Sequence, residues 1–155
     1  MLLSDHISPG AILLLPQVRT RTQLFPLLVE SLCASGIPCD PGQMLSGILE
    51  REAKMPTSIG LGIAIPHVRM DSAPGLVAAV AICPIGLDYA VPDGVPVRLA
   101  FLLVSPPSAA GLHVRALAAV GRVSSARVDD LIHCASADEF LERWKLGEAR
   151  ASGCV

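Results

Sequence analysis

Long apolar runs are missing from this sequence, although 52% of its 155 residues are hydrophobic. A membrane-spanning helix needs about 18 or more consecutive apolar residues, and the longest candidates, Leu76–Ile82 and Leu99–Val104, have only the length of a strand. The N-terminal segment carries Asp5 where a secretory signal would begin with positive charge. We therefore expect a cytoplasmic protein that does not insert into a membrane.

A strong net charge is also missing. Charged residues make up 17% of the chain, and the formal net charge is -2. Nucleic-acid-binding proteins usually present a basic surface, so nucleic acid is not an expected partner. The length suits one compact domain with a substantial core, and we expect residues 1–155 to form that single domain.

Closely paired cysteines are absent as well. The five cysteines are scattered and include no C-x-x-C motif: Cys33, Cys39, Cys83, Cys134 and Cys154. An odd, scattered set is more typical of reduced thiols than of a disulfide framework. It also argues against zinc, which needs four ligands gathered at one site.

Four segments have the apolar spacing and the start signals of helices. The first is expected over Gln23–Ser35 with Pro26 in its first turn, and Asp40 caps the second, which begins at Pro41. The third begins near Leu112 or His113, and a capping box at Ser136 to Glu139 opens the fourth. The expected buried faces are Leu24, Leu27, Leu28 and Leu32; Met44, Leu45, Ile48 and Leu49; Val114, Leu117, Ala118 and Gly121; and Phe140, Leu141 and Trp144.

Two segments, Leu76–Cys83 and Val97–Val104, are typical of buried strands that are apolar on both faces. Residues 55–62 are loop-like, and Ile63–Ile65 is a short extended run that Pro66 ends. A sheet that is apolar on both faces is covered by helices on both sides. The alternation of helices and strands therefore predicts an α/β fold.

Three side chains stand out as candidates for chemistry. Arg51 lies near the end of the second helix, His67 directly follows the short extended run, and His113 opens the third helix. Strand ends and helix starts offer free main-chain donors and a favourable dipole to anions. A neutral imidazole keeps a lone pair that can attack phosphorus, and a guanidinium with a second imidazole can stabilise the resulting phosphoryl group.

Each of these residues also has a structural explanation when it is taken alone. His67 could be a core histidine bonded to main chain, His113 a helix-start residue facing solvent, and Arg51 a solvated surface arginine. The residues that surround them favour the chemical interpretation.

The segments Leu49–Glu52 and Pro56–His67 closely resemble the active-site region of IIA domains of the phosphoenolpyruvate-dependent sugar phosphotransferase system, in the fructose, mannitol and nitrogen-regulatory branch. Further similar segments follow in that family's order: Gly86–Tyr89, Asp93–Val97, Phe101–Pro106 and His113. The resemblance covers Leu2 to Lys145, which is nearly the whole chain.

This resemblance implies a mixed sheet with helices on both faces. It implies that His67 is phosphorylated on Nε2, with His113 as the second active-site histidine and Arg51 beside them. The donor would be a histidine-containing phosphocarrier protein, and the acceptor a IIB component or a regulatory target. No metal or organic cofactor is implied. Docking between two proteins further suggests that His67 lies accessible in a shallow apolar depression.

Two alternative functions remain at this level. The chain could act mainly as a binding module that contacts a transporter, kinase or regulator and is switched by phosphorylation, because the IIB and membrane IIC parts of a sugar uptake route are not found in it. It could also be a hydrolase that uses serine or cysteine. The sequence contains no G-x-S-x-G motif, and none of its cysteines lies beside a predicted helix start next to positive charge.

Overall fold

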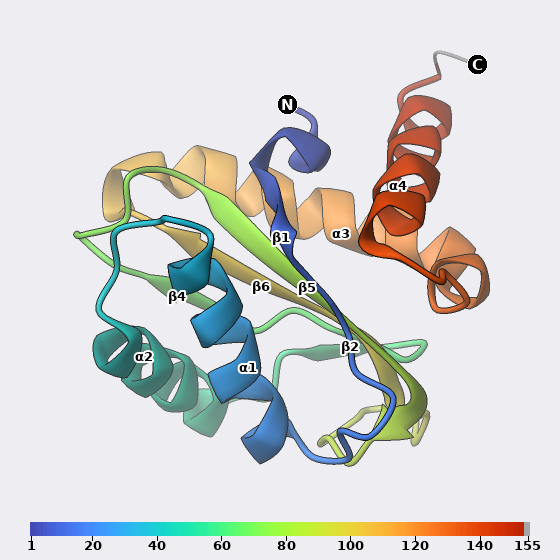
Figure 1. The fold of residues 1–155 in the computed structure, drawn as a ribbon, viewed down its shortest axis with the longest axis horizontal. Coiled ribbons are helices and arrows are strands. Elements are labelled where there is room, and N and C mark those ends of the chain that lie inside the picture. The colour runs from blue at the N-terminus through green and yellow to red at the C-terminus, as the bar shows by residue number, and fades with distance from the viewer. Residues whose placement is uncertain (154–155) are drawn as a thin grey trace.

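The computed structural model of the protein describes residues 1–153 and forms one layered α/β unit (Figure 1). Its helices are η1 (Leu3–His6), α1 (Arg21–Ala34), α2 (Pro41–Lys54), η2 (Pro107–Ala109), α3 (Ala110–Leu131) and α4 (Ala137–Ala151). Its strands are β1 (Ile7–Leu14), β2 (Ser58–Gly60), β3 (Ile63–Ala64), β4 (His67–Arg69), β5 (Val77–Leu87) and β6 (Val97–Ser105).

The six strands form one mixed sheet in the order β1-β5-β6-β3-β2, and β4 pairs with β6 beyond the end of β3. β5 and β6 are antiparallel, whereas β1 runs parallel to β5, and β3 and β4 run parallel to β6. The short strand β4 therefore lies at the edge of the sheet, beside the C-terminal half of β6.

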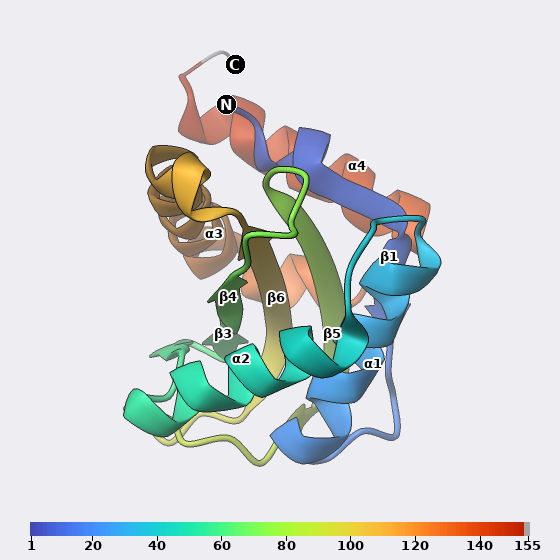
Figure 2. The ribbon, with the colours of Figure 1, turned by 90° about the vertical axis from the view of Figure 1, so that its left-hand side faces the viewer.

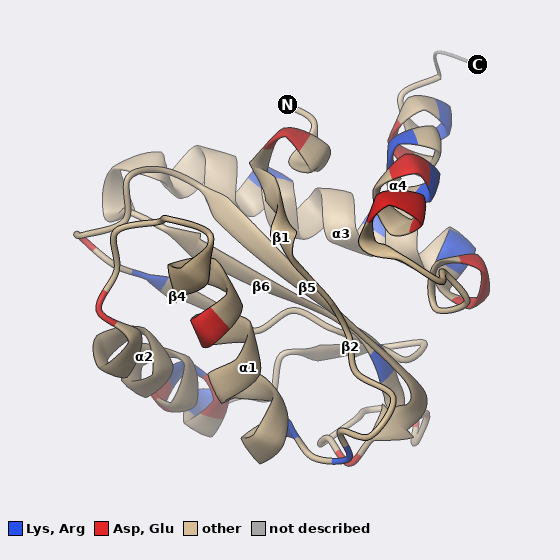
Figure 3. Ribbon diagram, in the orientation of Figure 1, with Lys and Arg blue, Asp and Glu red and all other residues tan. Residues whose placement is uncertain are grey.

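Helices cover both faces of this sheet, which confirms the predicted fold class. Figure 2 shows α1 and α2 on one side of the strands and α3 and α4 on the other. Alternate residues of the central strands point to opposite faces of the sheet. Val80 and Phe101 belong to the core between the sheet and helices α3 and α4. Ala79 and Leu102 belong to the core between the sheet and helices α1 and α2. Charged residues lie mostly on the helices and loops (Figure 3).

The predicted helix starts are largely correct. Asp40 and Ser136 each accept a hydrogen bond from the main-chain N–H three residues later, as a cap should. The first helix begins two residues earlier than expected, because Thr20 and Gln23 form a complete capping box. Pro26 consequently lies in the second turn rather than the first.

The strands differ more from expectation. The sequence pattern gave no sign of β1, because Pro9 and Gly10 interrupt its apolar alternation; as a strand at the sheet edge, β1 tolerates both. Part of the expected loop, Ser58–Gly60, is β2. His67 is the first residue of β4 rather than a loop residue after a strand, since the chain resumes pairing with β6 directly after Pro66.

The expected buried face of α3 is wrong. Val114 is 58% exposed, while the buried residues of this helix are His113, Ala116, Ala119, Val120, Val123, Ser124 and Leu131. The helix contains so many small and apolar residues that several faces satisfy helical spacing, and polar His113 did not suggest the buried one. Leu49 of α2 is likewise 49% exposed, because the inward stripe of that helix runs through Met44 and Ile48.

One cysteine pair contradicts the prediction of reduced thiols. Cys33 at the end of α1 and Cys39 before α2 form a disulfide, because the turn between the two helices brings their Cα atoms to 6.1 Å. Cys83 and Cys134 are free and buried, and burial raises the pKa of Cys83 to about 12, so that thiol stays protonated. Cys154 lies outside the described residues.

Within the described part of the chain, no helix has both the length and the apolar character needed to cross a membrane.

Candidate active site

His67 is held in one orientation by its main-chain neighbour. Its Nδ1 lies 2.8 Å from the carbonyl oxygen of Ile65, and a carbonyl can only accept, so the proton of the neutral ring is on Nδ1. The Nε2 atom then carries a free lone pair, and it accepts a hydrogen bond of 3.2 Å from Nε of Arg51. The ring is half-buried at the start of β4.

Arg51 reaches this position from the last turn of α2. One of its terminal nitrogens donates to the carbonyl oxygen of Met55 at 2.9 Å, so the guanidinium bridges the helix end and the imidazole. The next residue, Glu52, points the other way into the core, where it accepts from the Thr57 main chain at 3.3 Å and from the Tyr89 hydroxyl at 2.7 Å. Glu52 thus fixes the path of the chain between α2 and β2.

His113 faces His67 from the other side of the sheet edge. The two ring centroids are 5.3 Å apart, and the rings are inclined at 64°. His113 is only 1% exposed, and its Nδ1 lies 2.6 Å from the hydroxyl oxygen of Ser105. Its Nε2 is buried and has no hydrogen-bond partner among the described residues. The three predicted residues are therefore brought together by α2, β4 and α3.

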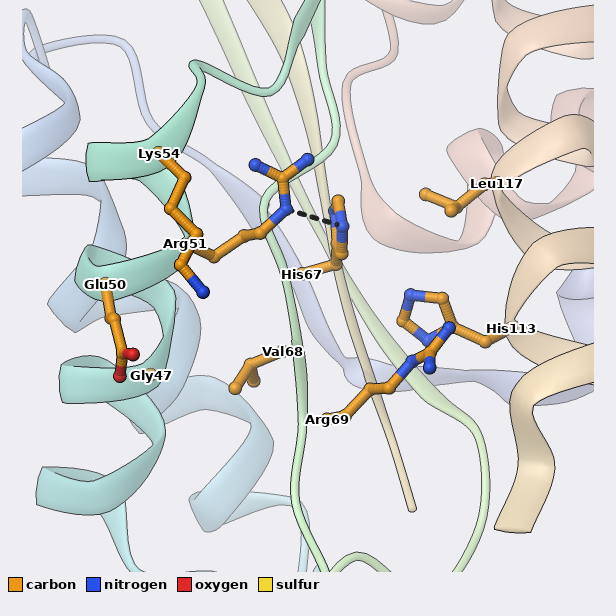
Figure 4. A pocket seen from close by; sticks show the side chains of 9 residues that line it. All are labelled: Gly47, Glu50, Arg51, Lys54, His67, Val68, Arg69, His113 and Leu117. Atoms are coloured by element: carbon orange, nitrogen blue, oxygen red, sulfur yellow. Dashed lines mark hydrogen bonds between the residues drawn. The ribbon is translucent and has the colours of Figure 1, made fainter. Parts of the chain in front are cut away.

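The depression that contains these rings has a volume of about 420 Å³. Figure 4 shows its lining side chains, which include the cations Arg51, Lys54 and Arg69 as well as Glu50. The expectation of an apolar depression is thus wrong, because three basic residues surround it. No acidic partner is found for Lys54 or Arg69 in the described residues, so the site favours an anion.

Burial keeps both imidazoles neutral. It is the main reason that the pKa of His67 lies below its ordinary value of 6.5; the hydrogen bond to Ile65 opposes this shift, and the charge of Arg51 adds to it. Burial also lowers the pKa of His113 to about 4, with His67 and Arg69 acting in the same direction. At neutral pH, both rings are therefore uncharged.

The distance between α2 and β4 is set by a glycine. Gly47 faces Val68, and a Cβ atom at position 47 would lie 2.5 Å from a Val68 methyl carbon, closer than such atoms can approach. Glycine weakens a helix interior by roughly 0.5–1 kcal/mol relative to alanine. Here it allows the helix that carries Arg51 to lie directly against the strand that carries His67.

Sequence reasoning missed three residues of this site. Arg69 lies two residues after His67, and in a strand that spacing places both side chains on one face. Lys54 lies three residues after Arg51, which places it on the same side of α2. Arg69 was detectable once β4 was recognised as a strand, and Lys54 was detectable from the helical spacing of α2 alone. Ser105 was not, because its role depends on the packing of β6 against α3.

Comparison with known proteins identifies the family. The sequence profile described as "Phosphoenolpyruvate-dependent sugar phosphotransferase system, EIIA 2" matches residues 5–145. The chain belongs to this EIIA family. Its members are phosphoryl-transfer proteins, and the matched segment contains all of the site residues described above.

The relatives of this family member include both regulatory and sugar-specific proteins. It is 30% identical to the nitrogen regulatory protein of Bradyrhizobium diazoefficiens over 79% of this chain and 80% of that protein. It is 29% identical to the fructose-specific EIIA component of Haloferax volcanii, over 66% of this chain and 67% of that protein.

Solved structures of EIIA proteins share the fold. The nitrogen regulatory protein IIA-Ntr from Neisseria meningitidis matches with a TM-score of 0.82 and 25% identity, over 92% of this chain and 98% of that one. The mannitol enzyme IIA of Escherichia coli, solved in complex with phosphorylated enzyme IIB, matches with a TM-score of 0.73 and 19% identity, over 89% and 95%. EIIA domains pass phosphoryl groups to IIB partners, as that complex illustrates.

Proposed function

We propose that this protein is a phosphoryl carrier that accepts a phosphoryl group on Nε2 of His67 from a histidine-phosphorylated carrier protein. The main support is the hydrogen bond from His67 Nδ1 to the Ile65 carbonyl, which leaves the Nε2 lone pair facing a cationic depression. A nucleophile with its proton on the far nitrogen needs no general base.

Transfer of the phosphoryl group from the donor phosphohistidine to His67 needs no further reactant. The Nε2 lone pair of His67 attacks phosphorus, and the phosphorus–nitrogen bond of the donor phosphohistidine breaks. The electron pair of that bond stays on the donor nitrogen, and the donor ring, which carries a proton on its other nitrogen, leaves as a neutral imidazole. No proton leaves Nδ1 of His67 during this step, because the Ile65 carbonyl continues to accept from it.

In this proposal, Arg51 and His113 stabilise the transferred group. The guanidinium that now donates to the lone pair of His67 would turn to the phosphoryl oxygens, where charge-assisted hydrogen bonds are strong. His113 would donate from the opposite side. The acceptor would be a IIB component, and the whole chain, residues 1–155, would act in the cytoplasm as one EIIA domain.

A second candidate function is regulation of a target protein by the phosphorylation state of His67. The similarity to a nitrogen regulatory protein and to the IIA-Ntr structure favours it. A phosphoryl dianion would change the charge of the depression and thereby the proteins that dock there. Proteins captured by wild type, His67→Ala and His67→Asp should then differ; an identical set would contradict a switch.

The phosphoryl-carrier proposal is tested by incubating the protein with phosphoenolpyruvate, the general phosphotransfer enzyme and the histidine-containing carrier, followed by intact-mass measurement. We expect one added phosphoryl group in wild type, none in His67→Ala, and slower but detectable labelling in His113→Ala. His133→Ala is the matched control, because His133 is an exposed histidine and should label like wild type. Failure of wild type to label while a known family member labels would refute the proposal.

A further inference from the structure

The hydroxyl of Ser105 is a buried polar group that the proposed function does not yet use. Ser105 is the last residue of β6, is 0% exposed, and is paired across the ladder with Arg69 of β4. Its Oγ has a single hydrogen-bond partner among the described residues, Nδ1 of His113 at 2.6 Å. This short contact joins the central sheet to the first turn of α3.

The contact can be made in two ways, and they place the His113 proton on different atoms. If Nδ1 carried the proton and donated to Ser105, the serine hydroxyl hydrogen would be buried without an acceptor. If the serine donates to Nδ1 instead, the serine hydrogen has an acceptor, and the ring proton lies on Nε2 of His113, where it has none. The first arrangement leaves two buried groups of this pair unpaired, the serine hydrogen and the Nε2 lone pair, whereas the second leaves one, the Nε2–H. Buried polar groups are usually paired, so the second arrangement is favoured.

No residue in the described part of the chain supplies an acceptor for that Nε2–H. Nε2 of His113 is buried and unpartnered, and Figure 4 shows the ring directed into the same depression as His67, 5.3 Å away between ring centroids. A phosphoryl group on His67 would bring three acceptor oxygens into this space. The orphaned nitrogen is thus explained by a ligand rather than by another side chain.

We infer that Ser105 is a positioning residue of this site. Its hydroxyl donates to Nδ1 of His113 and so holds the single proton of the neutral imidazole on Nε2, where it donates to the phosphoryl group on His67. The role in transfer rests on the proposed function, whereas the position of the proton does not.

Neutrality gives this arrangement a chemical advantage. An imidazolium at position 113 would add a full charge beside Arg51 and Arg69, and a phosphoryl group held by three cations would leave less readily for the next protein. A neutral N–H donor orients the phosphoryl group but attracts it less strongly than a cation would. Ser105 selects that donor without adding charge.

The first experiment locates the His113 proton by nitrogen-15 NMR of the side-chain ring at pH 7, without any phosphate donor. We expect wild type to carry the proton on Nε2, and Ser105→Ala to shift the signals toward Nδ1–H or a mixture of the two tautomers. Ser105→Thr, which keeps the hydroxyl, should restore the wild-type pattern. Wild type with its proton on Nδ1, or Ser105→Ala with an unchanged pattern, would overturn the inference.

The matched control is Ser124→Ala. Ser124 is also a fully buried serine and lies on α3, but residues 1–153 offer its hydroxyl no hydrogen-bond partner, and it does not line the depression. This variant should keep the wild-type His113 signals, so it separates loss of the specific hydrogen bond from loss of a buried hydroxyl. Thermal unfolding of each variant shows that it is folded.

The second experiment measures the initial rate of phosphoryl transfer to His67. We expect Ser105→Ala to be about tenfold slower than wild type, the change that corresponds to about 1.4 kcal/mol in a transition state, with Ser105→Thr and Ser124→Ala close to wild type. Equal rates for Ser105→Ala and wild type would overturn the role in transfer. If wild type itself is not labelled, the proposed function fails, and the NMR result still decides where the proton lies.

Discussion

At the scale of single residues, the site depends on imidazoles that stay neutral and on cations that have no acidic partner within residues 1–153. His67 and His113 are desolvated from opposite sides of the sheet edge, and Arg51 and Arg69 approach them from α2 and β4. Two predictions belong to this scale.

Replacing Arg69 with glutamine should slow phosphorylation of His67 by roughly ten- to a hundredfold, because a charge-assisted hydrogen bond to the phosphoryl group contributes roughly 1.5–3 kcal/mol. The pKa of His113 should rise in the same variant but stay below 6.5, since burial, its main cause, remains. Transfer rates and an NMR titration measure the two effects. Arg122→Gln changes an exposed arginine of α3 and is the control; an equal loss in both variants would contradict a local role.

The stability of the protein should fall in mild acid because of His113. Its pKa is about 4 in the folded state and about 6.5 when unfolded, so between these values the unfolded chain binds more protons and unfolding becomes easier as the pH decreases. One pKa unit corresponds to about 1.4 kcal/mol, which makes the loss from pH 7 to pH 4 up to about 3 kcal/mol.

Chemical denaturation at several pH values tests this effect. His113→Gln should show a flatter dependence of the unfolding free energy on pH between 6.5 and 4 than wild type. A wild-type slope in His113→Gln would show that other groups cause the acid sensitivity.

At the scale of elements, the disulfide between Cys33 and Cys39 connects α1 to α2, the helix that carries Arg51. Closing so short a loop should stabilise the fold by about 2 kcal/mol through the entropy of the unfolded chain. Reduction should therefore lower the unfolding free energy of wild type by that amount and leave Cys33→Ser/Cys39→Ser unchanged.

Alkylation of the unfolded protein without reductant provides a direct check. We expect three of the five cysteines to be modified, since two are in the disulfide. Modification of all five would mean that the bond does not form.

The elements also show where prediction from sequence succeeds. Caps at Asp40 and Ser136 and the long apolar strands β5 and β6 were predictable, because their signals are local. The inward face of α3 was not, because burial of His113 is decided by Ser105 and by the sheet edge rather than by the polarity of the helix. Local signals identified the three candidate side chains. They missed Arg69, whose place depends on the pairing of β4, and Ser105, whose contact with His113 depends on the packing of β6 against α3.

At the scale of the whole molecule, the two cores should unfold together. Neighbouring residues of β5 and β6 pack into opposite cores, so neither core can be lost while the other keeps its strands. The chain has one tryptophan and one tyrosine, and they lie on opposite faces: Trp144 under α3 and α4, Tyr89 under α1 and α2.

Tryptophan fluorescence and tyrosine absorbance should therefore give the same denaturation midpoint. In Trp144→Phe, tyrosine absorbance follows unfolding without any contribution from tryptophan. Distinct midpoints for the two faces would mean that they behave as separate folding units.

The contact between Gly47 and Val68 has a consequence for the history and the engineering of this protein. Exchanging a helical glycine for alanine is among the commonest ways to make a protein more robust, yet a methyl group here would wedge α2 away from β4 and carry the guanidinium of Arg51 away from the ring of His67. Substitutions that raise thermal stability are therefore expected elsewhere in the chain. Helix α2 should keep its destabilising Gly47 wherever the contact between Arg51 and His67 is required.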